Sequence, residues 1–198
     1  MLKSFIFLLS IPTFAFIPNS FKMNYTQEFK SQVSQQNRSG TGVFEYKYPS
    51  NLKIDQEKPE KLVYVSNSKT TWIYRAPLFD DEPAEVTVHK GQAASLSSFF
   101  DILKDGLKTN GNYSVAIKGS EALLTFNKSA SKSTGIKTAT LKFNKADRLI
   151  FDELNIIDIS YTDGRLVELK LSNIATKVTF PAKHFVFEIP KGAKVLKQ

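Results

Sequence analysis

Residues 39–77 decide the fold, and they read SGTGVFEYKYPSNLKIDQEKPEKLVYVSNSKTTWIYRAP. Apolar and aromatic side chains recur at every second position, which is the period of a β-strand, because successive side chains point to opposite faces. Turn residues separate the runs at 49–51, 58–59 and 67–68. Such short connections join antiparallel neighbours, so the stretch predicts a four-stranded meander with one bulky apolar face that needs a cover. The recurring large side chains are Phe44, Tyr46, Tyr48, Leu52, Ile54, Leu62, Tyr64, Trp72 and Tyr74.

The sequence on either side of this meander also favours strands. Residues 20–36 begin with alternating apolar side chains and predict a first strand, although Phe21, Tyr25 and Phe29 lie four apart and leave a short helix as the competing interpretation. Six further strand-like runs follow residue 112, ending with 184–190, and residues 128–135 are expected to be a polar loop. We therefore expect a mainly β (α+β) fold, with about ten strands in a strongly curved antiparallel sheet and a helix across its concave side.

The clearest predicted helix covers residues 93–108. It has a serine N-cap at 95 or 97 and Asn110-Gly111 as its stop. Two interpretations fit its phenylalanine-rich stripe: an ordinary helix packed on a sheet, or a lid over a lipid-binding hollow. The stripe consists of Leu96, Phe99, Phe100, Leu103 and Leu107.

Residues 1–15 have the features of a secretory signal. Lys3 precedes an apolar run over residues 5–11, and small residues lead to Ala15. The run is shorter than the roughly 20 apolar residues that span a bilayer, which argues against the alternative of a permanent anchor. We expect cleavage after Ala15 and a single exported domain over residues 16–198. The chain contains no cysteine, so disulfides, thiol catalysis and lipid attachment at the new N-terminus are excluded.

The formal net charge of +8 does not by itself indicate nucleic acid. The lysines are scattered through strands and turns, and no nucleic-acid motif is present, which indicates a solvated polar face. A weak attraction to anionic lipid surfaces is the milder functional interpretation. The acidic run 78–85 lacks the glycine and the closing glutamate of a calcium loop, so a plain solvated loop is expected and no metal is implied.

No catalytic constellation emerges from the sequence. His89 and His184 are the only histidines, and neither has the neighbours of a Ser-His-Asp arrangement. Glycine-rich phosphate loops, HExxH motifs and tuned carboxylate pairs are absent from the sequence. The chain is predicted to be a binding protein, without enzymatic activity or a cofactor.

A series of loosely defined motifs extends over nearly the whole chain after residue 15. They are Phe21 with Thr26-Gln27, Gly40 and Gly42, Pro49 and Pro59, Val65-Ser66, Trp72 with Tyr74, and Phe185, Phe187, Pro190 and Gly192. In their order and spacing, which make the similarity fairly specific, they resemble the LolA family of periplasmic outer-membrane lipoprotein carriers.

The resemblance implies an incomplete β-barrel whose helical lid covers an apolar cavity for the acyl chains of lipoproteins. It further implies a monomer in the periplasm that receives its cargo from an inner-membrane ABC transporter and delivers it to an outer-membrane receptor. Because a slip of one residue inverts a strand, the face assignment depends on register. The expected lining is Phe44, Tyr46, Leu52, Ile54, Leu62, Tyr64, Trp72 and Tyr74 from the sheet, and Leu96, Phe99, Phe100, Leu103 and Leu107 from the lid.

Two departures from the family concern the lid. Many relatives place an arginine before the first proline, where it tethers the lid, whereas this chain has Tyr48. The latch is therefore absent, replaced by the Tyr48 hydroxyl, or supplied by Lys47. The usual first helix also has almost no room between Ala15 and Phe21, which implies a thinner cover.

Two other classes of protein fit the same residues. One is an envelope sensor of the same fold that binds lipoprotein or glycolipid, although such sensors usually have a second domain or a lipidated cysteine. The other is a structural β-protein with a filled interior and no ligand.

Overall fold

Twelve strands form one curved, open sheet in the computed structural model, which describes residues 16–30, 37–77, 79, 81–91 and 96–198. The predicted signal over residues 1–15 lies outside these residues. The strand order is β12-β6-β5-β4-β3-β2-β1-β11-β10-β9-β8-β7. The strands are β1 (Ser20–Lys30), β2 (Asn37–Lys47), β3 (Asn51–Lys58), β4 (Leu62–Ser66), β5 (Thr70–Arg75), β6 (Glu85–Lys90), β7 (Tyr113–Lys118), β8 (Glu121–Phe126), β9 (Ile136–Phe143), β10 (Leu154–Tyr161), β11 (Leu166–Thr176) and β12 (Lys194–Lys197).

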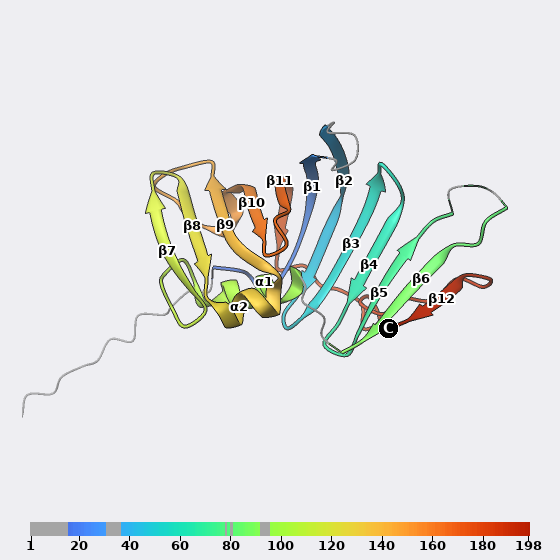
Figure 1. Cartoon of the computed structure of the whole chain (residues 1–198). Coiled ribbons are helices and arrows are strands. Elements are labelled where there is room, and N and C mark those ends of the chain that lie inside the picture. Colours follow the sequence, from blue (N-terminus) through green and yellow to red (C-terminus); the bar gives the residue numbers. More distant parts are fainter. Residues whose placement is uncertain (1–15, 31–36, 78, 80, 92–95) are drawn as a thin grey trace, which may run out of the picture.

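Strands β1 to β11 pair antiparallel with their neighbours, which confirms the predicted meander over β2 to β5 and the strand at β1. The edge strand β12 pairs with β6 in parallel. Because β7 and β12 lie at opposite ends of the order, the sheet does not close on itself. Figure 1 shows the sheet curving so that its two halves face each other.

The helices lie together on the concave side of the sheet (Figure 1). Helix α1 (Leu96–Ile102) continues as a 3-10 turn, η1 (Leu103–Asp105), and contacts β3 and helix α2 (Lys128–Thr134). A second 3-10 turn, η2 (Phe151–Glu153), precedes β10. In the described part of the chain, no helix is long and apolar enough to cross a bilayer.

The predicted helix over residues 93–108 was too long at its C-terminal end. Gly106 ends it with a φ of 88° and donates its N–H to the Leu103 carbonyl, so the chain turns before Asn110-Gly111. Residues 93–95, including the candidate cap Ser95, lie outside the described residues, and Ser97 is buried inside the helix.

Residues 128–135 were predicted to be a loop, which is wrong because they form helix α2. The side chain of Asn127 accepts a hydrogen bond from the Ala130 N–H as N-cap, and Gly135 closes the helix in the left-handed conformation. Ala130 and Thr134 are buried. A short helix whose polar side chains face water shows too little apolar periodicity to be recognised.

The C-terminal run 184–190 was predicted to be a strand, which is wrong. It has no strand pairing and packs against the outer face of the sheet. Phe180, Phe185 and Phe187 form a second apolar cluster with side chains of β4 and β5, and the Asn67 amide donates to the Phe185 carbonyl. Phe185 and Phe187 have the two-residue spacing of a strand, but their side chains pack on the outer face of the sheet and the segment does not join it as a strand. The last strand is β12, at the far edge.

A buried carboxylate holds this C-terminal segment in place. The Glu45 side chain is one-tenth exposed and lies 2.9 Å from both Lys22 Nζ and His184 Nε2, with Lys53 Nζ at 3.8 Å. Burial opposes its ionisation, yet the hydrogen bonds from Lys22 and His184 outweigh burial and hold the pKa of Glu45 below its usual range. Glu45 therefore links β1, β2 and the C-terminal segment.

Replacing Glu45 by glutamine is expected to lower the free energy of unfolding at pH 7 by about 1–2 kcal/mol, because it removes a charged hydrogen-bond acceptor. A carboxyl whose folded pKa is lowered stabilises the fold above its unfolded pKa of about 4.5 and loses that contribution as pH falls through the folded value. The parent should therefore show a loss of stability at acid pH that Glu45→Gln lacks. Urea unfolding between pH 7 and about pH 3 measures both effects. If the exposed control Glu57→Gln changed the free energy of unfolding and its pH dependence as much as Glu45→Gln does, the role of Glu45 would be contradicted.

Candidate functional site

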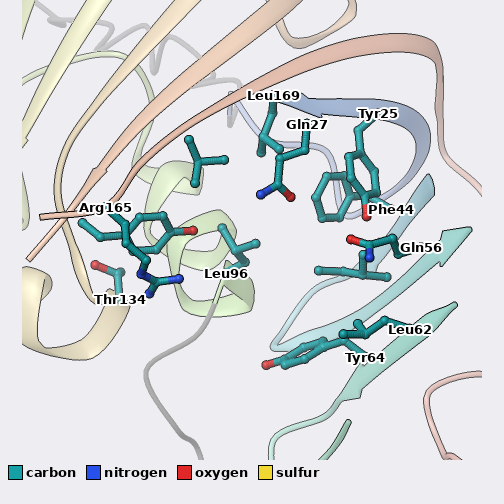
Figure 2. A pocket seen from close by; sticks show the side chains of 13 residues that line it. Tyr25, Gln27, Phe44, Gln56, Leu62, Tyr64, Leu96, Thr134, Arg165 and Leu169 are labelled. Atoms are coloured by element: carbon teal, nitrogen blue, oxygen red, sulfur yellow. The ribbon is translucent and has the colours of Figure 1, made fainter. Parts of the chain in front are cut away.

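A pocket of about 310 Å³ opens on the concave side of the sheet. Figure 2 shows its side chains converging from the strands of both halves and from helix α1. The lining residues are Tyr25, Gln27, Phe44, Ile54, Gln56, Leu62, Tyr64, Leu96, Thr134, Tyr161, Arg165, Val167 and Leu169.

Strand register aligns the apolar wall of this pocket. Phe44 on β2 pairs with Ile54 on β3, which in turn pairs with Tyr64 on β4. Side chains at paired positions share one face of a sheet, so these three form a continuous row. Val167 and Leu169 on β11 supply the facing wall, and Leu96 projects from the first turn of α1.

An aromatic core fills the concave side beneath the pocket. The Phe21 ring lies 5.0 Å from Tyr46 and 5.1 Å from Phe100, and Phe100 lies 5.4 Å from Phe99 (ring centroids). All four side chains are almost completely buried. The pocket therefore lies beside Leu96 at the start of α1. Next to it, Phe99 and Phe100 of the helix fill the space between the two halves of the sheet.

The structure brings five of the predicted lining residues to the pocket and places six others in the core below it. Tyr46, Leu52, Phe99, Phe100 and Leu103 are buried in that core, and Leu107 packs against it from beyond the end of the helix. The five at the pocket are Phe44, Ile54, Leu62, Tyr64 and Leu96.

Trp72 and Tyr74 were assigned to the wrong face. In the β4–β5 pairing Trp72 lies opposite Val65 and Tyr74 opposite Val63, so they share the outer face with these valines. There they join the second apolar cluster, where the Tyr74 ring lies 5.6 Å from that of Phe187. Sequence alternation gives the two faces of a strand but not which one is concave, and here both faces of β4 and β5 carry apolar side chains.

A carboxylate attaches helix α1 to the turn between β2 and β3. Asp101 Oδ1 accepts hydrogen bonds from the Tyr46 hydroxyl (2.6 Å) and the Ser50 N–H (3.0 Å), and Oδ2 accepts one from the Ser50 hydroxyl (2.6 Å). Burial, together with the bond to Asp101, raises the pKa of Tyr46 far above its usual range. Asp101 therefore joins α1 to the turn that directly follows the latch candidates Lys47 and Tyr48.

Neither latch candidate takes part in this contact. The Tyr48 ring is exposed and has Lys104 Nζ 4.5 Å from its centroid, which is a cation–π contact between the turn and η1. Burial lowers the pKa of Lys104, although Asp101 opposes this. Lys47 is exposed on the opposite face of the sheet, in a second hollow with Asn51 and Asn67. Residues 16–19 form no helix before β1.

Sequence analysis missed eight residues of the lining. Two kinds of signal existed: Tyr25 continues the alternation of Phe21 and Met23, and Val167 and Leu169 alternate along β11. The polar members, Gln27, Gln56, Thr134, Tyr161 and Arg165, carry no such signal, because a polar residue at a pocket and one in solvent look alike in a sequence.

Burial keeps two phenols of the pocket protonated. Burial, and secondarily the charge of Asp55, raises the pKa of Tyr25 to about 12, and burial also raises the pKa of Tyr161, so both phenols stay protonated. No carboxylate, cysteine or histidine is present among the described lining residues. The described residues also contain no group of three or more side chains that could hold a metal ion.

Comparisons with known proteins identify the relatives of this chain. The family model described as "Outer membrane lipoprotein carrier protein LolA" matches residues 18–188. A protein named "Outer-membrane lipoprotein carrier protein" from Legionella pneumophila (strain Corby) is 27% identical over 180 residues, which cover 88% of this chain and 82% of the relative. Its namesake from Actinobacillus pleuropneumoniae serotype 3 (strain JL03) is 24% identical over 177 residues, 89% of this chain and 77% of the relative. Among solved structures, a LolA superfamily protein from Nitrosomonas europaea gives a TM-score of 0.46 at 11% identity, covering 88% of this chain and 93% of that one.

Proposed function

Because the chain belongs to the LolA family of outer-membrane lipoprotein carriers, we propose that it carries lipoproteins across the periplasm with their acyl chains shielded from water. The observation that carries this proposal is the apolar pocket on the concave side, lined by Phe44, Ile54, Leu62 and Val167 beside helix α1. Its volume of about 310 Å³ lies at the lower end of the range for small-molecule sites, about 300–1,000 Å³.

The free energy of exposing acyl chains explains the need for such a carrier. Burial stabilises each CH₂ by about 0.8 kcal/mol, so an ordinary acyl chain in water costs on the order of 10 kcal/mol. A lipoprotein with several chains cannot cross an aqueous compartment unaided. The apolar part of the pocket presents branched and aromatic side chains, whose non-directional contacts suit flexible chains of different lengths.

Loading of several chains requires helix α1 to move. A pocket of this size takes one chain, and the space beside it is filled by Phe99 and Phe100 of α1. Helix α1 is short and is attached to the sheet by the Asp101 contacts at one end. We expect α1 to act as the lid, leaving the concave face when cargo enters and returning when it is released.

The proposed route across the periplasm requires two partner proteins. An inner-membrane ABC transporter releases the lipoprotein to the carrier, and an outer-membrane receptor accepts it, with the carrier acting as a monomer. Neither transfer needs a reaction step, because the acyl chains pass from one apolar environment to another. The direction then depends on the relative affinities of the two partners and the pocket.

Placing a carboxylate in the pocket is expected to weaken acyl binding. In Leu62→Glu a charge lies on the apolar wall, and the affinity for a dipalmitoylated peptide should fall at least about tenfold, because a desolvated charge costs more than 1.4 kcal/mol. The matched control is Leu123→Glu on β8, at an exposed position outside the pocket. Displacement of a fluorescent acyl probe measures both.

A second experiment examines the natural cargo. Mass spectrometry of the protein purified without detergent from the periplasm should find lipoprotein or acyl lipid with the parent and with Leu123→Glu, and less with Leu62→Glu. Equal amounts with all three proteins, or none with any, would contradict the carrier function.

A further inference from the structure

One end of the pocket is mainly apolar, with Gln56, whose amide donates to the Glu60 carbonyl, as a polar member; the other end is polar (Figure 2). Phe44, Leu62 and Tyr64 lie toward one side, whereas Thr134 and Arg165 lie across from them, beyond Leu96 (Figure 2). The amide of Gln27 reaches from β1 into the space between the two sides (Figure 2). An acyl chain alone needs only the apolar side, so the polar side is available to whatever the chain is attached to.

Two hydrogen-bond donors, one between the two sides and one at the polar end, have no partner in the protein. Within the described part of the chain, neither the Gln27 amide nor the Tyr161 hydroxyl makes a hydrogen bond to another residue; both side chains are partly buried, and their polar atoms remain accessible to water. Thr134 is already engaged, since its hydroxyl donates to the Ala130 carbonyl and accepts from the Ile136 N–H. Partly buried donors without a protein partner are suited to an acceptor on a ligand.

The charge of the polar end favours a neutral acceptor. Arg165 is the one charged residue of the described lining, and its Nε donates to Asp163 Oδ2 at 2.7 Å in an exposed ion pair. Its guanidinium carbon lies 4.6 Å from the centre of the Tyr161 ring. An anionic head group would find an exposed arginine that is already paired, whereas a carbonyl oxygen needs only the N–H and O–H groups that the site offers.

The geometry points to Gln27 and Tyr161 as a subsite for the ester or amide carbonyl groups at the head of a bound acyl chain, with the hydrocarbon lying along Phe44, Ile54 and Leu62. This inference rests on the proposed function and makes it more specific. The subsite selects acyl chains that end in a neutral carbonyl group over plain hydrocarbons and fatty-acid anions. It also sets the direction of the chain in the pocket, with its head toward β10 and its tail toward β4.

The test uses three probes of equal chain length: methyl palmitate, hexadecane and palmitate. Their affinities are measured by displacement of a fluorescent acyl probe from the parent, Gln27→Leu and Tyr161→Phe. Each variant should bind methyl palmitate about three- to tenfold more weakly and hexadecane unchanged, because each removes one hydrogen bond and no apolar surface. The controls are Asn155→Leu, at an exposed position on β10, and Tyr74→Phe, on the outer face; both should bind all probes like the parent.

The outcomes separate the subsite from the carrier function. Equal weakening of hexadecane and methyl palmitate, or no weakening of either, would overturn the subsite and leave the carrier function intact. A larger and salt-sensitive effect on palmitate would also overturn it, since it would indicate an anion site at Arg165. Failure of the parent to bind any of the three probes would overturn the proposed function itself. Thermal unfolding of each variant shows whether it is folded.

Discussion

Replacing Asp101 by alanine is expected to lower the free energy of unfolding by about 3 kcal/mol and to loosen helix α1. The carboxylate accepts three hydrogen bonds, from the Tyr46 hydroxyl, the Ser50 N–H and the Ser50 hydroxyl. Its loss leaves the buried Tyr46 hydroxyl without an acceptor, and an unsatisfied buried polar group costs about 1–3 kcal/mol beyond the bonds themselves. Ser50 has a φ of 59°, a strained conformation for a serine, which Asp101 helps to hold.

The same change should alter access to the pocket. Hydrogen exchange of the α1 amides is expected to speed up more than that of the sheet, because Asp101 joins the helix to the β2–β3 turn. Association of an acyl probe should become faster, since the lid leaves the concave face at a lower free-energy cost. Urea unfolding, hydrogen exchange and stopped-flow fluorescence measure the three effects.

A neighbouring aspartate provides the matched control. Asp105 in η1 is exposed and accepts one hydrogen bond, from the Asn112 amide at 3.1 Å. Asp105→Ala should lower stability by at most about 1 kcal/mol and leave the association rate unchanged. Equal effects of the two alanine variants would show that Asp101 does not attach the lid. Tyr48→Arg tests the family's latch position directly: because Asp101 already holds the turn, we expect little change in the retention of lipoprotein.

The contrast between Asp101 and Tyr48 shows where prediction from the sequence ends. The alternation in residues 39–77 predicted the meander correctly, because a half-buried strand must repeat every two residues. In the sequence Asp101 is a single polar residue that follows Phe99 and Phe100 in a short helix. Its partners are 51 and 55 positions away in the chain. Contacts of this kind depend on how the helix crosses the sheet, which local spacing does not encode.

The same limit explains the wrong face of Trp72 and Tyr74 and the missed helix α2. Trp72 and Tyr74 alternate as expected, but the C-terminal segment covers the outer face of β4 and β5, where they pack with Val63 and Val65. Helix α2 depends on an asparagine cap and on two buried small residues rather than on an apolar stripe. The local sequence determines which segments form strands and helices, whereas the tertiary contacts of each face determine which residues line the pocket.

Replacing Gly42 by alanine is expected to cost about 3 kcal/mol or more of the free energy of unfolding. A Cβ atom at this position would lie 2.9 Å from the Gln56 Cα and from a ring carbon of Tyr25, and closer still to the Asp55 carbonyl oxygen. Two of these neighbours are backbone atoms of β3, so β2 and β3 must separate, and overpacking of this kind costs about 1–3 kcal/mol or more. The register between the two strands already shifts at Thr41/Gly42, where the close approach occurs.

The pocket should respond to this change together with the stability. Tyr25 pairs with Gly42 across β1 and β2, lies over it, and packs its ring 4.3 Å from that of Phe44. A methyl group on residue 42 displaces the Tyr25 ring into the pocket, so acyl-probe affinity should also fall. Gly111→Ala is the matched control, because a Cβ there meets nothing within 4 Å. If Gly42→Ala unfolds at the same urea concentration as Gly111→Ala, the close strand approach at residue 42 does not constrain the wall, and the pocket must owe its shape to α1 alone.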